Sequence, residues 1–207
     1  SWDVQSTPSW RYWPGAGRYA TYAKTALWMT SLERLIGWDM MQKTLSTFFT
    51  SRRFTHPTPE AFFLTATSVS GRDLTWFFDA VYRSAASFDY AVEQVTSQAE
   101  GDGVHNTVVI RRAADGVFPV DVLTTFDDGS SVVDRWDGAD RWRAFQYDRK
   151  AHVRTVQIDP DRILTLDVNY TNNSWTATPR AAEAAKKWAL RWLTWLQTVM
   201  LTYAFYA

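Results

Sequence analysis

The side chains of this sequence that could bind a metal or transfer protons are few and widely spaced. Histidine occurs three times, as His56, His105 and His152, and there is no cysteine. A catalytic zinc site on a helix needs two histidines four residues apart, a glutamate between them that acts as base, and a third ligand from a later helix. The sequence contains no such H-E-x-x-H pattern. We therefore expect no metal and no other cofactor in this chain, and we expect the three histidines in loops or in solvent.

The triplet Tyr22-Ala23-Lys24 is the remaining candidate for chemistry, because a phenol and an ammonium group stand two residues apart at the head of a helical pattern. Both groups are hydrogen-bond donors. Tyr19, three residues earlier, is a competing candidate. On residue type alone, either tyrosine is more often a core or interface residue than a catalytic one.

Four helices are predicted to position this triplet. The first begins near Tyr19 and ends at Gly37, and Asp39 is expected to cap the second. Thr58 followed by Pro59 is typical of a helix start, and Gly71 ends this third helix. The apolar stripes at 3.6-residue spacing are Leu27, Trp28, Leu32, Leu35 and Ile36; Met40, Met41, Leu45, Phe48 and Phe49; Phe62, Phe63, Ala66 and Val69; and Leu74, Phe77, Phe78, Val81 and Tyr82. Residues 19–86 therefore predict two helical hairpins, after an irregular lead-in over residues 1–17.

Beyond Tyr90 the apolar period changes from 3.6 to two, which is typical of strands. The runs are Thr107–Arg111, Val120–Phe126, Val132–Trp136, Trp142–Tyr147, Val153–Ile158 and Leu164–Val168, separated by Asp- and Gly-rich turns. Such spacing predicts an antiparallel β-sandwich. The expected architecture is α+β, with a helical domain over residues 1–88, a β-sandwich over 89–176 and a C-terminal amphipathic, Trp-rich helix over 177–207. Asp159, Asp161 and Asp167 could form a calcium cluster, but turn and strand-end carboxylates are the commoner arrangement.

Length and composition limit the class of protein. The chain has 207 residues, 46% of them hydrophobic, which is enough for a substantial core. Its 22 basic and 22 acidic residues give a formal charge of zero, so nothing in the charge balance attracts nucleic acid. The chain opens Ser1-Trp2-Asp3 without an initiator methionine or leader, which favours a piece of a longer protein. Without cysteines the compartment cannot be read from redox chemistry.

The tail combines basic residues with an apolar helix. Lys186, Lys187 and Arg191 precede the uncharged stretch from Trp192 to Ala207, which is shorter than a membrane span and contains three threonines and a glutamine. Residues 188–207 could meet a membrane surface or pack on protein, including a second copy of the chain. We expect packing on protein, because an interface accommodates the threonines and the glutamine at a lower desolvation cost than hydrocarbon does.

Several motifs in fixed order resemble the aminopeptidase N family of zinc metallopeptidases, also called gluzincins. The resemblance runs from Tyr19 to Val92 and from Phe118 to Asn173. Its motifs are Tyr22-x-Lys24, Ile36-Gly37, Pro57-Thr58-Pro59, Ser70-Gly71-Arg72-Asp73-Leu74, Trp76-Phe77-Phe78, Phe118-Pro119-Val120-Asp121-Val122, the Asp127-Asp128-Gly129 turn, Trp136-Asp137-Gly138, Ile158-Asp159-Pro160-Asp161 and Leu166-Asp167-Val168-Asn169. Thr25 departs from the family pattern, which has glycine there.

The resemblance implies that residues 1–88 are the end of a thermolysin-like catalytic domain and that the sandwich follows it. In the family, zinc and a glutamate activate water, and the tyrosine of the Tyr-x-Lys motif donates a hydrogen bond to the tetrahedral intermediate. The resemblance thus assigns this catalytic role to Tyr22, with the zinc motif and the peptide's amine site in an upstream domain of the same protein. The sequence leaves the compartment of the parent unknown, with a membrane-associated or periplasmic/extracytoplasmic parent as one option. The rival interpretation is a peptidase-like binding or scaffold module, or a membrane-associating domain, without chemistry.

Overall fold

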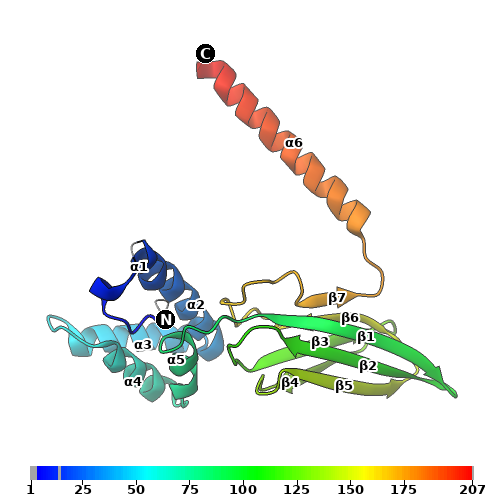
Figure 1. Cartoon of the computed structure of the whole chain (residues 1–207), viewed down its shortest axis with the longest axis horizontal. Helices are drawn as coiled ribbons and strands as arrows, with labels where there is room; N and C mark the ends of the chain where they lie inside the picture. Colours follow the sequence, from blue (N-terminus) through cyan, green and yellow to red (C-terminus); the bar gives the residue numbers. More distant parts are fainter. Residues whose placement is uncertain (1–3, 14, 207) are drawn as a thin grey trace. The chain divides into compact units, whose positions relative to one another are not determined.

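The computed structural model describes residues 4–13 and 15–206, and the chain divides into two compact units, Ser1–Trp175 and Thr176–Ala207. Residues 1–3 and 14 of the predicted lead-in, and Ala207 of the predicted tail, lie outside the described residues. The first unit contains the short helices and both sheets, and the second contains a single long helix (Figure 1). The further division at residues 88 and 89 stays a prediction.

The helical part of the first unit consists of short helices joined by tight turns. Its helices are α1 (Ala16–Arg18), a π-helical segment (Tyr19–Ala23), α2 (Lys24–Ile36), α3 (Trp38–Arg52), α4 (Pro59–Ser70) and α5 (Thr75–Val81), after a 3-10 turn at Ser9–Arg11. Gly37 and Gly71 end α2 and α4 with φ angles of 87° and 66°, which are left-handed values that favour glycine. Both helix stops and the Thr58-Pro59 start are therefore confirmed.

Two details of α3 differ from the prediction. Asp39 is not the N-cap, because the helix begins one residue earlier, at Trp38, directly after Gly37. The buried side of α3 is formed by Met41 and Thr44, whereas Phe49 is 69% exposed. The Thr44 hydroxyl donates to the Met40 carbonyl oxygen at 2.8 Å, so its polar group is satisfied inside the helix. Of the predicted stripe, Met40, Met41 and Phe48 pack on the core, whereas Leu45 and Phe49 are exposed.

The sheets form two antiparallel layers whose inner faces share one hydrophobic core. One sheet has the order β1-β2-β5 and the other β4-β3-β6-β7. The strands are β1 (Tyr90–Glu100), β2 (Gly103–Arg112), β3 (Val120–Phe126), β4 (Ser131–Trp136), β5 (Trp142–Arg149), β6 (Val153–Ile158) and β7 (Ser174–Thr176). Buried and accessible residues alternate along β2 and β3, as expected when one face of each sheet covers the core. The α+β architecture with an antiparallel sandwich is confirmed.

One predicted strand is absent, and two observed strands, β1 and the short β7, were not predicted. The sequence did not predict β1, because half of this strand is exposed and polar and its pairing with β2 shifts between Val92 and Gln94. Residues 164–168, predicted as a strand, form turns with one parallel bridge between Phe88 and Asp167. The Asp159 carboxylate accepts hydrogen bonds from the backbone N–H groups of Ile163 and Leu164 at 2.9 and 2.8 Å, which holds the start of this segment in a turn.

Aromatic and polar contacts join the helices to the sandwich within the first unit. The ring of Phe118 lies 6.1 Å from that of Phe77 on α5 and 6.2 Å from that of Phe88, with edge-to-face geometry. The Ser31 hydroxyl on α2 accepts from the backbone N–H of Thr165 at 3.0 Å. The helices and the sandwich therefore share one buried core.

The second unit contains α6 (Ala181–Tyr206). No described helix combines the length and the apolarity needed to cross a membrane.

Candidate functional site

The candidate triplet lies where a π-helical segment passes into α2. The segment Tyr19–Ala23 lies between α1 and α2, and Lys24 is the first residue of α2. A π-helical turn contains an extra residue, so it rotates the side chains before it relative to those after it, and such turns occur frequently at functional sites. The structure therefore places Tyr19, Tyr22 and Lys24 on a local irregularity of an otherwise continuous helix.

Both tyrosines are accessible. Tyr22 is 74% exposed and Tyr19 is 72% exposed. Within residues 4–13 and 15–206, the Tyr22 hydroxyl makes no hydrogen bond, so its donor is available to a bound molecule. Neither tyrosine is therefore a core residue, and the interface role that residue type also allows stays a prediction.

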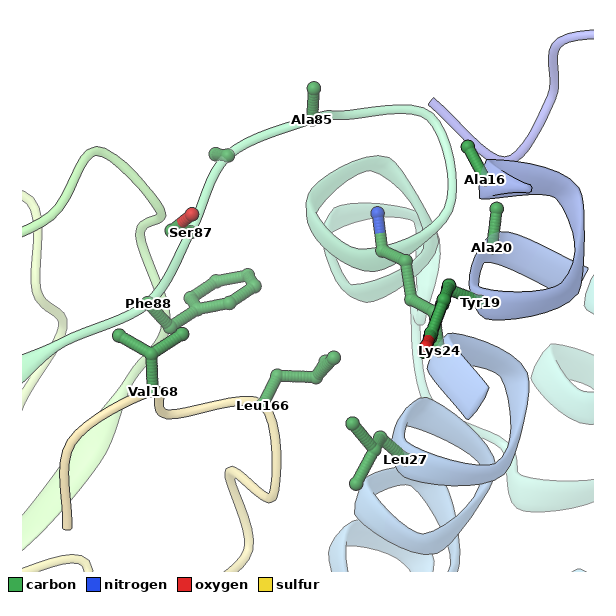
Figure 2. Close-up of a pocket in the computed structure, with 11 residues that line it drawn as sticks. Ala16, Tyr19, Ala20, Lys24, Leu27, Ala85, Ser87, Phe88, Leu166 and Val168 are labelled. Carbon is green, nitrogen blue, oxygen red and sulfur yellow. The ribbon is translucent and has the colours of Figure 1, made fainter. Parts of the chain in front are cut away.

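Lys24 ties this turn to the segment between α5 and β1. Its Nζ atom donates a hydrogen bond of 3.0 Å to the carbonyl oxygen of Ser84, sixty residues later in the chain. Figure 2 shows the side chain extending away from the helix axis toward this segment. The contact anchors the head of α2, so Lys24 positions the turn that carries Tyr22.

A hollow of about 440 Å³ opens beside the triplet. Tyr19 and Lys24 line it, but Tyr22 does not, and the opposite wall comes from the segment before β1 and from the turns after β6 (Figure 2). The remaining lining residues are Ala16, Ala20, Leu27, Ala85, Ala86, Ser87, Phe88, Leu166 and Val168. Sequence reasoning missed this wall, because no local pattern signals which residues of a distant connection will face a helix.

Thr25, the departure from the family pattern, is accommodated by hydrogen bonds. Its hydroxyl donates to the carbonyl oxygen of Thr21 at 2.5 Å and accepts from the side-chain amide of Gln5. The Gln5 side chain also accepts a 2.9 Å hydrogen bond from the indole N–H of Trp28. The Thr25 side chain thus connects the helix to the lead-in segment.

The histidines lie in three different places. His56 lies between α3 and α4, and His152 between β5 and β6, as expected for loop residues, but His105 is a strand residue of β2. Pairing places His105 opposite Asp148, and its Nδ1 atom lies 2.6 Å from the carboxylate. These two side chains and Glu100 bring potential ligand atoms within 4.8 Å of one another. This is a one-histidine, two-carboxylate group on a solvent-facing surface, and the prediction that the chain holds no metal stays a prediction.

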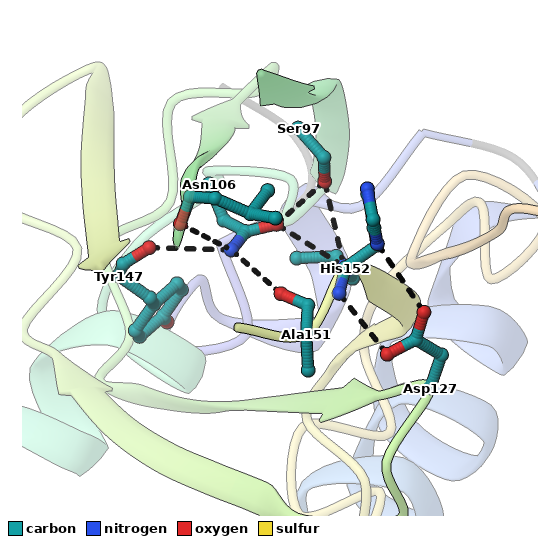
Figure 3. A network of polar contacts seen from close by, with 8 residues as sticks. Ser97, Asn106, Asp127, Tyr147, Ala151 and His152 are labelled. Atoms are coloured by element: carbon teal, nitrogen blue, oxygen red, sulfur yellow. Dashed lines mark hydrogen bonds and ion pairs between the residues drawn. The ribbon is translucent and has the colours of Figure 1, made fainter. Parts of the chain in front are cut away.

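His152 belongs to a polar network around a buried amide. The Asp127 carboxylate accepts from the backbone N–H of His152 at 3.1 Å, and its other oxygen lies 3.3 Å from the His152 ring (Figure 3). Nearby, the fully buried Asn106 donates to the carbonyl oxygens of Tyr147 and Ala151 at 3.2 and 3.0 Å. These contacts join β2, β5 and the turn before β6, so they hold the end of the sandwich together.

Two of the three carboxylates considered for calcium are engaged by the protein's own donors. The Asp167 carboxylate accepts from the backbone N–H groups of Tyr90 and Asn169 and from the Asn173 side chain. Burial raises the pKa of Asp159, against the opposing effect of its two backbone hydrogen bonds. The carboxylates of Asp159 and Asp167 therefore stabilise turns through hydrogen bonds to the protein itself, which is the turn and strand-end arrangement expected from the sequence.

Comparisons with known proteins bear on the fold. No protein-family model matches the sequence, and no curated protein matches it at a significant level. Among solved structures, 17 chains match. One is the crystal structure of Legionella pneumophila aminopeptidase A in complex with aspartic acid, with 16% identity and a TM-score of 0.50. The match covers 73% of this chain and only 18% of that protein. At this identity the likeness concerns the fold alone, and the chain has the fold of part of a peptidase.

Proposed function

We propose that this chain is the C-terminal part of a zinc metallo-aminopeptidase, in which Tyr22 stabilises the oxyanion and the β-sandwich supports the catalytic domain. The chain alone would be inactive, since it has no H-E-x-x-H motif. The residues present do not fit a catalytic zinc site, so the metal and the base belong to an upstream domain of the same protein.

The observation that carries the proposal is that the Tyr22 side chain is exposed and that its hydroxyl has no hydrogen-bond partner among the described residues. Its hydroxyl is exposed and unpartnered within the described residues, at a helix start held by the contact from Lys24 to the Ser84 carbonyl oxygen. An exposed aromatic side chain on an anchored backbone is suited to meet a bound molecule, because its donor need not be released from another partner. The fold likeness to an aminopeptidase supports the same interpretation at the level of architecture.

The chemistry expected of Tyr22 is that of a fixed donor. When water adds to a peptide carbonyl, the carbonyl oxygen becomes negatively charged, and a phenolic O–H aimed at that position stabilises the charge as it develops. Removal of one such donor costs about 3 kcal/mol of transition-state stabilisation. The substrate would be a peptide with a free N-terminus, bound largely by groups outside this chain.

The sequence of the gene upstream of the Ser1 codon tests the proposal directly. We expect it to encode H-E-x-x-H followed by a glutamate on a later helix, in the same reading frame. An upstream region with the histidines or the glutamate replaced would instead favour a peptidase-like binding or scaffold module, and it would remove the catalytic role from Tyr22.

A further inference from the structure

Helix α6 separates its charged residues from its apolar residues along its length. Lys186, Lys187, Arg191 and the single acid Glu183 all lie in its first half, and no charged residue follows Arg191. The acid is already paired, since a Glu183 carboxylate oxygen lies 3.7 Å from the guanidinium of Arg180. The basic residues of α6 therefore outnumber the acids, and they stand directly before an uncharged end.

Many apolar residues of α6 share one broad exposed face, although the exposed Leu190, Leu201 and Phe205 lie on the opposite side of the helix. At 100° per residue, Trp188, Trp192, Trp195, Leu196, Met200 and Tyr203 fall within an arc of about 140°. Trp188, Trp192 and Trp195 are 59%, 63% and 57% exposed. The rings of Trp192 and Trp195 meet edge-to-face at 5.5 Å, so the indoles form a continuous aromatic surface. Soluble proteins rarely leave such a surface uncovered.

The threonines of α6 do not oppose an apolar environment, contrary to the expectation from sequence. The hydroxyls of Thr194, Thr198 and Thr202 donate to the carbonyl oxygens four residues earlier, at 3.0, 2.9 and 2.8 Å. Their donors are therefore satisfied inside the helix, and moving them out of water does not leave an unpaired O–H group. Gln197 is then the main polar side chain of the uncharged end.

The junction between the two halves combines a cation with an indole. The guanidinium of Arg191 lies 5.6 Å from the centre of the Trp188 ring. Tryptophans beside basic residues are typical of segments at the boundary between lipid headgroups and acyl chains, where the indole is partly buried and the cation reaches phosphate.

We propose that α6 binds the surface of an anionic lipid bilayer. The apolar arc would enter the boundary between headgroups and acyl chains, and Lys186, Lys187 and Arg191 would lie at the lipid phosphates. This inference does not depend on the proposed peptidase function, because it uses only residues of α6.

Charge complementarity favours lipid over a second copy of the helix. A parallel pair would bring two sets of Lys186, Lys187 and Arg191 together, with only Glu183 from each copy to oppose them. An antiparallel pair would place the basic half of one copy beside the uncharged half of the other. Neither arrangement neutralises the cations, whereas an anionic surface does.

Flotation of the full chain with lipid vesicles tests the proposal. The chain should float with vesicles of phosphatidylcholine and phosphatidylserine, and it should not float with phosphatidylcholine alone. Raising the salt to about 1 M, where the Debye length falls to about 3 Å, should release most of it. The flotation at high salt uses the unaltered chain, so its result does not depend on whether a variant folds.

Two matched charge reversals add a control. Lys186→Glu with Lys187→Glu should lower the partition coefficient for anionic vesicles at least about tenfold. Lys43→Glu with Arg154→Glu makes the same change in net charge at exposed positions of the first unit and should leave partition nearly unchanged. Failure to float with anionic vesicles, equal flotation with neutral ones, or an equal effect of both pairs would overturn the proposal. A stable dimer in sedimentation that excludes vesicles would also overturn it, in favour of self-association.

Discussion

The hydroxyl oxygens of Ser31 and Thr165 lie 2.9 Å apart, although 134 residues separate them in the chain. Ser31 is fully buried on α2, and it also accepts the backbone N–H of Thr165 at 3.0 Å. The Thr165 hydroxyl in turn lies within hydrogen-bond distance of the Leu27 carbonyl oxygen, at 2.6 Å. This pair therefore links the helix that carries Lys24 to the turns after β6.

Substitution Ser31→Ala should lower the free energy of unfolding by about 1–1.5 kcal/mol, because the hydroxyl and the backbone N–H of Thr165 lose the Ser31 hydroxyl as a partner, while the N–H keeps the Ile163 carbonyl oxygen at 3.1 Å. Thr30→Ala is the control on the same helix. Among the residues that the structure describes, the Thr30 hydroxyl bonds only to the Ala26 carbonyl oxygen of its own helix, so its loss should cost about 0.5 kcal/mol or less. Urea denaturation of both variants measures the difference, and equal costs would contradict the proposed link.

Tyr90 predicts a loss of stability at high pH. Its buried hydroxyl donates to the carbonyl oxygen of Phe118 and accepts from the backbone N–H of Phe118, both at 2.8 Å. Burial raises the pKa of Tyr90 to about 12, although the hydrogen bond from Phe118 acts in the opposite direction. The unfolded chain, with a tyrosine pKa of about 10, loses this proton first. The raised pKa of Tyr90 therefore leaves the free energy of unfolding unaffected below about pH 10. As the pH rises from about 10 to about 12, ionisation of Tyr90 in the unfolded chain lowers the free energy of unfolding by about 2–3 kcal/mol.

The variant Tyr90→Phe separates this effect from other alkaline changes. It should cost about 1–3 kcal/mol at neutral pH, because the Phe118 backbone groups lose their partner. Above pH 10, the free energy of unfolding of this variant should fall less with pH than that of the unaltered chain. Burial raises the pKa of Tyr147 as well, so some alkaline loss should remain. Denaturation curves from about pH 7 to 12 give the result, and an unchanged alkaline slope would exclude Tyr90 as its source.

The metal content of the chain tests whether its three histidines bind zinc. We expect no stoichiometric zinc on residues 1–207 after dialysis, because three separated histidines cannot supply a tetrahedral site with an open position. His105 and its carboxylate neighbours Glu100 and Asp148 are the one group of potential ligands that the described residues bring together. Elemental analysis of His105→Ala beside the unaltered chain is the measurement. One retained zinc per chain, lost in the variant, would show that this expectation is wrong.

Local patterns predicted much of the fold, and long-range pairing accounts for what they missed. Gly37, Gly71 and Thr58-Pro59 marked helix ends correctly, since the conformation at each depends on the residue itself. The contact of His105 with Asp148 and the Lys24 contact with Ser84 depend on strand register and on chain packing, which no local period encodes. The turn over residues 164–168 was not predicted for a similar reason. Hydrogen bonds from the backbone N–H groups of Ile163 and Leu164 to the Asp159 carboxylate hold this apolar run in a turn instead of a strand.

The catalytic role of Tyr22 is tested most directly by kcat of the Tyr22→Phe variant in the intact enzyme that contains this chain. Because the hydroxyl acts on the transition state, we expect kcat to fall about a hundredfold or more, with KM much less changed. Tyr19→Phe is the matched control, since Tyr19 is equally exposed on the same turn, and it should retain nearly full activity. A kcat for Tyr22→Phe equal to that of the unaltered enzyme would contradict the account and return Tyr22 to a structural role.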